Sequence, residues 1–159
     1  MTVDDWALAL HVLSAFALVS AIVVFWVLIV AARRTDTPEA RIRIESVVGV
    51  GNAAFGIGSV GTILLGIWLA FSVGGYEIWN GWIVAALVLW AFAMWTGGRT
   101  GATFGRGATK ARELLDAGKP GPDGELLALN RTSQGTVMHA LTTIAVLLIL
   151  IDMIWKPGA

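Results

Sequence analysis

Four apolar runs, each about twenty residues long, constrain the fold of this chain more than any other feature of its sequence. They cover roughly residues 6–32, 47–73, 79–97 and 137–155. A helix rises 1.5 Å per residue, so about 20 residues cross the roughly 30 Å hydrocarbon core of a bilayer. The runs lack the strand alternation of a membrane barrel, and helices satisfy the backbone in lipid. The sequence therefore predicts an all-α, polytopic membrane protein with four transmembrane helices in an antiparallel bundle.

Composition excludes several other classes of protein. Hydrophobic residues make up 57% of the chain and charged residues 14%, against roughly 45–50% and 25% in an ordinary soluble domain. The chain has no cysteine, which excludes disulfides, thiolate metal sites and iron–sulfur clusters. Its formal net charge is zero, so we expect no nucleic-acid partner. Asp4 and Asp5 stand where a signal peptide would be basic, so the first run is expected to be a retained helix.

The basic residues predict how the bundle sits in the membrane. Of eleven lysines and arginines, ten lie within residues 33–43 and 99–131, and Lys156 is the exception. Positively charged loops stay in the cytoplasm, and tryptophans gather at membrane interfaces. The interfacial tryptophans at the opposite helix ends are Trp6, Trp79, Trp82 and Trp155. We therefore expect a multi-pass protein of a bacterial-type plasma (inner) membrane, with the N-terminus and C-terminus outside.

The predicted organisation is a single four-helix transmembrane domain over residues 1–159. Cap and first-turn residues at 36–39 extend the second helix into the cytoplasm, and residues 108–117 resemble a short helix within the third loop. The expected helices then cover about residues 6–32, 38–73, 79–101 and 126–155, and the expected cytoplasmic loops cover about residues 33–37 and 102–125.

Small residues recur every fourth position in two of these helices and predict close packing. One series lies in the second helix and the other at the end of the third, and the two are Ala54, Gly58, Thr62, Gly66, Ala70 and Gly97, Gly101, Gly105. We expect the second and third helices to approach each other here. A homo-oligomer interface or a flat cofactor on the glycine face are the alternatives.

Ionisable groups inside membrane helices are the candidate functional residues, because burying them is costly. Counted from Trp6 and Trp155, His11 lies roughly 7–8 Å deep and Asp152 roughly 4–5 Å deep. The first and last helices of a bundle are commonly neighbours, so we predict a His11–Asp152 pair that could hold a metal or haem b, with Met153 or Lys156 as a second axial ligand. In the alternative, Lys156 binds Asp152 at the i+4 position.

A second polar cluster is expected nearer the cytoplasm. His139 lies roughly 24 Å from the outer boundary, about 16 Å from the level of His11, so the two histidines would ligate one haem iron only if a helix were broken or strongly tilted. Instead His139 should lie near the level of Asn52 and close to Arg99, where the three side chains could form a weaker cofactor-binding pocket.

The segment Leu10-His11-Val12-Leu13 in the first helix resembles the opening helix of small bacterial four-helix membrane proteins. These are the CopD-like copper-resistance domains, the HemJ-like protoporphyrinogen oxidases and an uncharacterised family of integral membrane proteins similar to them. The resemblance to the HemJ-like group implies haem ligation by His11. That group also uses a lysine within a membrane helix, and the second and third predicted helices here contain none.

Two classes of function follow from these observations. The first is a haem- or metal-associated redox membrane protein with an outer-leaflet site around His11. The second is a non-enzymatic accessory or scaffold subunit, or a small oligomeric transporter-like bundle. The expected partners are membrane lipids and either a second copy of the chain or a membrane-complex partner. The sequence shows no nucleophile–base pair, so it identifies no catalytic residue.

Overall fold

The computed structural model of the protein describes residues 2–72, 77 and 79–157. Its helices are α1 (Val3–Arg33), α2 (Pro38–Ser72), α3 (Gly81–Asp116), α4 (Gly124–Asn130) and α5 (Ser133–Trp155), and this part of the chain contains no strand. α1, α2, α3 and the segment formed by α4 and α5 are long and apolar enough to span a membrane. The predicted all-α fold with four membrane-spanning helices is confirmed. The expected end of the second helix at residue 73 and most of the loop at 74–77 lie outside the described residues.

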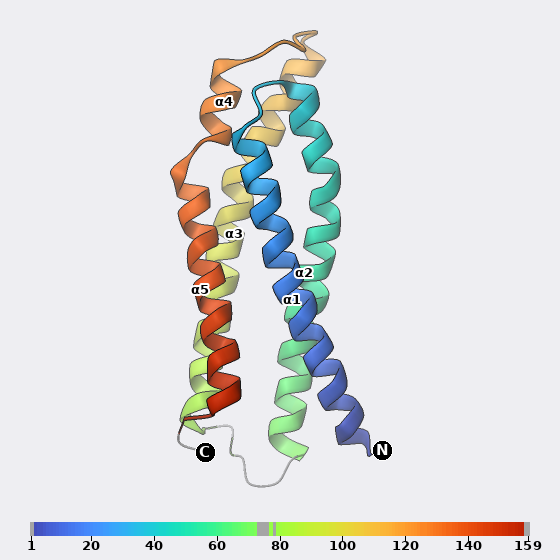
Figure 1. Ribbon diagram of the computed structural model, residues 1–159, viewed down its shortest axis with the longest axis vertical. Coiled ribbons are helices and arrows are strands. Elements are labelled where there is room, and N and C mark those ends of the chain that lie inside the picture. The colour runs from blue at the N-terminus through green and yellow to red at the C-terminus, as the bar shows by residue number, and fades with distance from the viewer. Residues whose placement is uncertain (1, 73–76, 78, 158–159) are drawn as a thin grey trace.

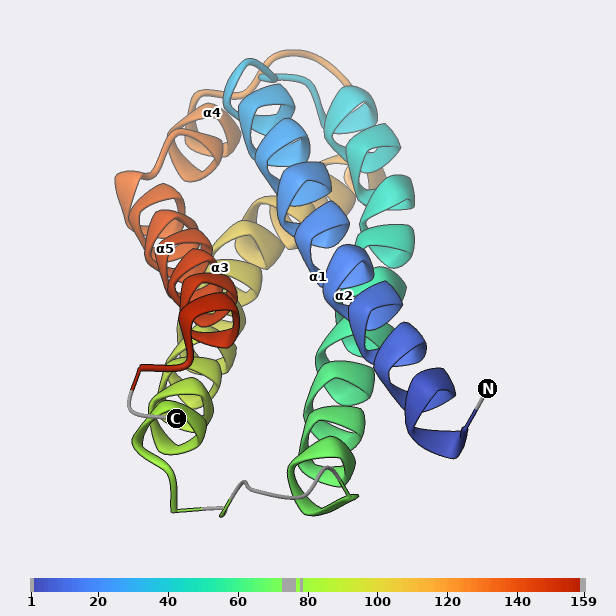
Figure 2. The ribbon, with the colours of Figure 1, turned by 60° about the horizontal axis from the view of Figure 1, so that its bottom comes forward.

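The bundle consists of two helix pairs. α1 packs along α2 and α3 packs along α5, whereas α2 and α3 make fewer contacts and α1 and α5 make very few. The pairs lie together at the end that carries α4, which we call the α4 end. They diverge toward the end where α1 begins and α5 ends, which we call the terminal end (Figures 1 and 2). This divergence decides which predicted neighbours meet.

Small residues explain the tight pairing of α1 with α2. A Cβ atom at Gly58 would lie 2.5 Å from the backbone nitrogen of Leu18 and 2.8 Å from the carbonyl oxygen of Ser14. Gly61 likewise faces the Ser14 side chain. The expectation that this face of the second helix meets the third is wrong, because the short connection between α1 and α2 makes those two helices neighbours. The glycine face therefore packs within the chain.

Two tryptophans join one helix pair to the other. The indole nitrogen of Trp26 in α1 donates to the hydroxyl of Thr143 in α5 at 2.9 Å. That of Trp90 in α3 donates to the Ser59 hydroxyl in α2, also at 2.9 Å. Inside a membrane such bonds satisfy groups that would otherwise lack a partner. The pairs are therefore linked through side chains rather than by close backbone contact.

The third helix is longer than expected. It continues to Asp116, although residues 102–125 were expected to form a loop with a separate helix at 108–117. The continuation is stabilised by burial, because Ala111 and Leu114 form a core cluster with Leu126 of α4. The expected helix at 126–155 is divided into α4 and α5 at Arg131 and Thr132. The Asp123 carboxylate accepts from the backbone N–H of Leu126 at 2.8 Å and begins α4 as its cap.

The connections at the α4 end are held together by hydrogen bonds. The Arg33 guanidinium donates to the carbonyl oxygens of Arg131 and Thr132 at 2.9 and 3.1 Å. The Asn130 amide donates to the carbonyl oxygen of Thr35 at 3.0 Å. The Lys110 ammonium pairs with Glu125 and connects α3 to α4. These segments, which were expected to be solvated loops, are built into the fold.

Candidate functional site

A cavity of about 480 Å³ lies between the two helix pairs, on the side of the bundle toward the α4 end. Residues of α1, α2, α3 and α5 form its walls. Most of the wall is apolar and includes Ile22, Phe25, Ile29, Phe55, Met94 and Phe104. Its size falls within the roughly 300–1,000 Å³ of small-molecule sites, which combine apolar walls with a few polar groups.

Glycines of α3 keep this cavity open. Gly98, Gly101 and Gly105 line it, and a Cβ atom added at any of them would have no other atom within 4 Å. The glycine series of the third helix, which we expect from the sequence to contact the second helix, therefore borders open space instead. Gly97 alone comes near α2, with the Phe55 ring 3.8 Å from its hypothetical Cβ. The four-residue spacing correctly identifies a glycine face on the third helix. This face lines a cavity and does not pack against another helix.

His139 and Asn52 both lie on the cavity wall, one from each helix pair. His139 is 3% exposed, and its Nε2 lies 3.2 Å from the carbonyl oxygen of Ile22. The edges of Trp26 and Phe25 surround its ring, with centroids at 4.9 and 6.1 Å. Asn52 is exposed, and its side-chain amide makes no hydrogen bond with any residue of the described chain. His139 and Asn52 are the two polar residues that the sequence predicts at the same depth in the membrane.

Arg99, the third member of that predicted cluster, does not line the cavity. Its side chain is exposed, and its guanidinium lies 5.5 Å from the centre of the Trp95 ring. A cation over an aromatic face is stabilised there and does not require a ligand. The structure therefore brings His139 and Asn52 to a common cavity and leaves Arg99 outside it.

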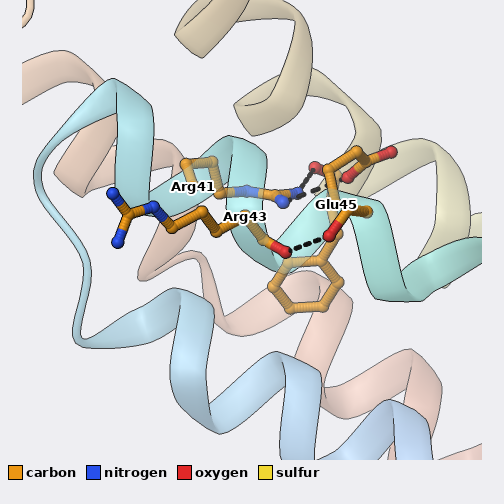
Figure 3. A network of polar contacts seen from close by, with 5 residues as sticks. Arg41, Arg43 and Glu45 are labelled. Carbon is orange, nitrogen blue, oxygen red and sulfur yellow. Dashed lines mark hydrogen bonds and ion pairs between the residues drawn. The ribbon is translucent and has the colours of Figure 1, made fainter.

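A buried ion pair, which the sequence analysis did not identify, closes the cavity toward the α4 end. Arg41 is 2% exposed, and its guanidinium donates to Glu45 at 3.0 Å and to the carbonyl oxygen of Phe104 at 2.8 Å. Figure 3 shows this contact, with the Arg43 side chain extending away from it. In the sequence, Arg41 contributes only to the positive charge from which the membrane topology is predicted. Its i+4 spacing from Glu45 was the available signal.

The predicted pair at the terminal end does not form. His11 packs on α2, where its Cε1 would lie 3.1 Å from a Cβ atom at Gly66. Its Nδ1 and the Oδ2 of Asp152 are each buried without a hydrogen-bond partner. Within the described chain no hydrogen bond or ion pair joins His11 to Asp152, because the two helix pairs diverge at this end.

Of the proposed second ligands of His11, Met153 lies on α5 and packs against residues of both α2 and α3, and Lys156 follows the end of α5. Met153 packs against a cluster of Ala70, Trp82 and Ile83, and the Lys156 ammonium lies 5.4 Å from the centre of the Trp82 ring.

The two histidines are far apart along the bundle. His139 contacts α1 at Ile22, which is eleven residues, or roughly 16 Å of helical rise, beyond His11. Among the described residues no group of three or more histidines, cysteines, aspartates and glutamates is placed to hold a metal ion.

Comparison with known proteins gives one match. No curated protein and no solved structure matches the chain. The comparisons therefore do not show the expected similarity to CopD-like or HemJ-like proteins. The model of a family described as a predicted integral membrane protein, DUF2269, matches residues 6–157. That match extends from the first turns of α1 to the end of α5, and so the chain belongs to the DUF2269 family of predicted integral membrane proteins.

Proposed function

We propose that the protein is a binding protein for a small, mostly apolar molecule that enters from the lipid bilayer. The observation that supports this function is the cavity of about 480 Å³ between the helix pairs. Across a cavity of this size the apolar walls cannot pack against each other, and a molecule that occupies it supplies those packing contacts. Limited contact between α2 and α3 leaves a side of the bundle from which a molecule in the membrane can enter.

Filling the cavity should abolish binding without disturbing the fold. A leucine at Gly101 would extend into the cavity, and its Cβ would meet no atom within 4 Å. Gly56→Leu is the matched control, because a Cβ at Gly56 also has free space and this residue does not line the cavity. We expect Gly101→Leu to reduce the co-purifying small molecule about tenfold, a change equivalent to about 1.4 kcal/mol. Solvent extraction and mass spectrometry of purified protein measure it.

Equal amounts of the same molecule from Gly101→Leu, Gly56→Leu and the unmodified protein would contradict this proposal. A loss that also occurs in Gly56→Leu would place the binding site elsewhere on the bundle.

A haem- or metal-associated redox role around His11 is our second proposal. One observation supports it, the buried Nδ1 of His11 without a hydrogen-bond partner in the described chain. Asp152 and Met153 remain the notional second ligands, and they would have to approach His11 across the limited contact between α1 and α5. A haem held by His11 predicts a Soret band that His11→Ala removes and His139→Ala retains. An absorbance spectrum and a metal analysis of the purified protein test this role, and colourless protein with no bound metal would reject it.

We also infer that the α4 end faces the cytoplasm of a bacterial-type plasma membrane and that both chain termini face outward. The basic residues at the α4 end support this topology. The chain has no cysteine. Maleimide labelling of a single introduced cysteine therefore shows on which side of the membrane that residue lies, without background labelling of other residues. A membrane-impermeant maleimide should label Val3→Cys in intact cells and label Gly121→Cys only after lysis. The reverse pattern would invert the topology.

A further inference from the structure

The polar groups on the cavity wall differ in the hydrogen-bonding capacity that they have left. Of the wall threonines, Thr142 has its hydroxyl 2.8 Å from the hydroxyl of Thr96, to which it is hydrogen-bonded, and the Thr100 hydroxyl donates to the carbonyl oxygen of Thr96. Both terminal nitrogens of Arg41 are engaged, with Glu45 and with the carbonyl oxygen of Phe104, and its Nε, which has no partner in the described chain, is too enclosed to reach a ligand. The groups with capacity for a ligand are therefore His139 and Asn52.

The contact with Ile22 fixes the chemistry of His139. A carbonyl oxygen only accepts hydrogen bonds, so Nε2 of His139 carries the proton. No acid forms an ion pair with His139 within the described chain, and an unpaired charge would be costly at this depth. In the uncharged ring Nδ1 is then an acceptor. Within the described chain this nitrogen has no hydrogen-bond partner, and it is not fully enclosed.

The charges on the wall cancel. Arg41 and Glu45 are the charged residues that line the cavity, and they form an ion pair with each other. An anionic head group would find no unengaged cation there, and its burial without one would be costly. A cationic head group would meet the same neutral pair. The cavity therefore favours a ligand without net charge.

From these observations we propose that the cavity binds an uncharged amphiphile whose head carries a hydroxyl group. The hydroxyl donates a hydrogen bond to Nδ1 of His139, and the amide of Asn52 supplies a donor for the oxygen of the ligand. The apolar body of the ligand lies against the apolar wall, which includes Phe55 and Met94. This inference rests on the proposed binding function and specifies the chemical class of its ligand.

Three probes that share a dodecyl chain test the head group, namely dodecanol, dodecyl methyl ether and dodecyl phosphate. Their binding to the full chain is compared at equal mole fraction in the same lipid nanodiscs by native mass spectrometry. The ether keeps the acceptor oxygen and lacks the donor, so we expect dodecanol to bind about five- to tenfold more tightly, as one hydrogen bond predicts. The phosphate should also bind more weakly than dodecanol, because the cation on the wall is already paired.

Variants assign the preference to the two residues. His139→Phe should bind dodecanol and the ether equally, and His11→Phe, which alters the other intramembrane histidine, should retain the preference. Asn52→Leu should weaken dodecanol and the ether by the same factor, and it removes no hydrogen bond within the described chain. It therefore serves as the test if His139→Phe does not fold.

The outcomes separate this inference from the function on which it rests. Equal binding of dodecanol and the ether, or tightest binding of the phosphate, would overturn the hydroxyl head group and leave a binding protein for apolar molecules. A preference that survives in His139→Phe would overturn the assignment to His139. Failure of all three probes to bind would overturn the inference and count against the proposed function as well.

Discussion

Arg41→Ala should lower the free energy of unfolding by about 3 kcal/mol, the lower end of the range for breaking a buried ion pair. The Arg41 side chain is 3% exposed and that of Glu45 is 26% exposed. Removal of the guanidinium leaves the Glu45 carboxylate unpaired and the carbonyl oxygen of Phe104 without its donor. Partial access of Glu45 to solvent keeps the loss at the lower end. Unfolding by sodium dodecyl sulfate in mixed micelles, followed by circular dichroism, measures the difference.

Arg43 provides the matched control for this substitution. It lies on the same helix and has the same charge, but its side chain is exposed and extends away from the ion pair (Figure 3). Arg43→Ala should therefore change the unfolding free energy by no more than about 0.5 kcal/mol. The double variant Arg41→Leu with Glu45→Leu should recover most of the loss, because no unpaired charge remains. Equal losses in Arg41→Ala and Arg43→Ala would show that Arg41 acts only through its charge.

The number and approximate limits of the spanning helices could be predicted because the bilayer determines them. Hydrocarbon thickness sets the length of an apolar run, and the requirement for backbone hydrogen bonds leaves helices as the solution. α1 spans Val3–Arg33 where residues 6–32 were expected, and α2 begins at Pro38 as the cap residues indicate. The extension of α3 to Asp116 escaped prediction because it depends on tertiary packing against α4.

The candidate site could be predicted only in part, because depth along a helix does not determine which neighbour a side chain faces. Depth placed His139 and Asn52 at one level, and both line the cavity. The same arithmetic placed His11 at the level of Asp152, but divergence of the helix pairs separates α1 from α5. The cavity itself depends on the relative placement of four helices, which no local pattern encodes.

Gly58→Ala should be as damaging as the loss of Arg41, even though it adds one carbon atom. The new Cβ would lie 2.5 Å from the backbone nitrogen of Leu18, 2.8 Å from its Cα and 2.8 Å from the carbonyl oxygen of Ser14. These are backbone atoms of a helix and cannot rotate away as a side chain would. α1 and α2 must therefore separate, and we expect a loss of about 3 kcal/mol, the upper part of the range for overpacking. The same detergent titration measures it.

Gly56→Ala distinguishes close packing from a general effect of adding a methyl group to α2. A Cβ at Gly56 would meet no atom within 4 Å, so this variant should unfold like the original protein or be stabilised by up to about 1 kcal/mol through helix propensity. Separation of α1 from α2 would also move Ile22 relative to α2, and with it the wall that holds His139. Gly58→Ala should therefore weaken ligand binding from a site outside the cavity, whereas Gly56→Ala should not. Equal stability of the two variants would mean that the glycine face of α2 does not determine the α1–α2 contact.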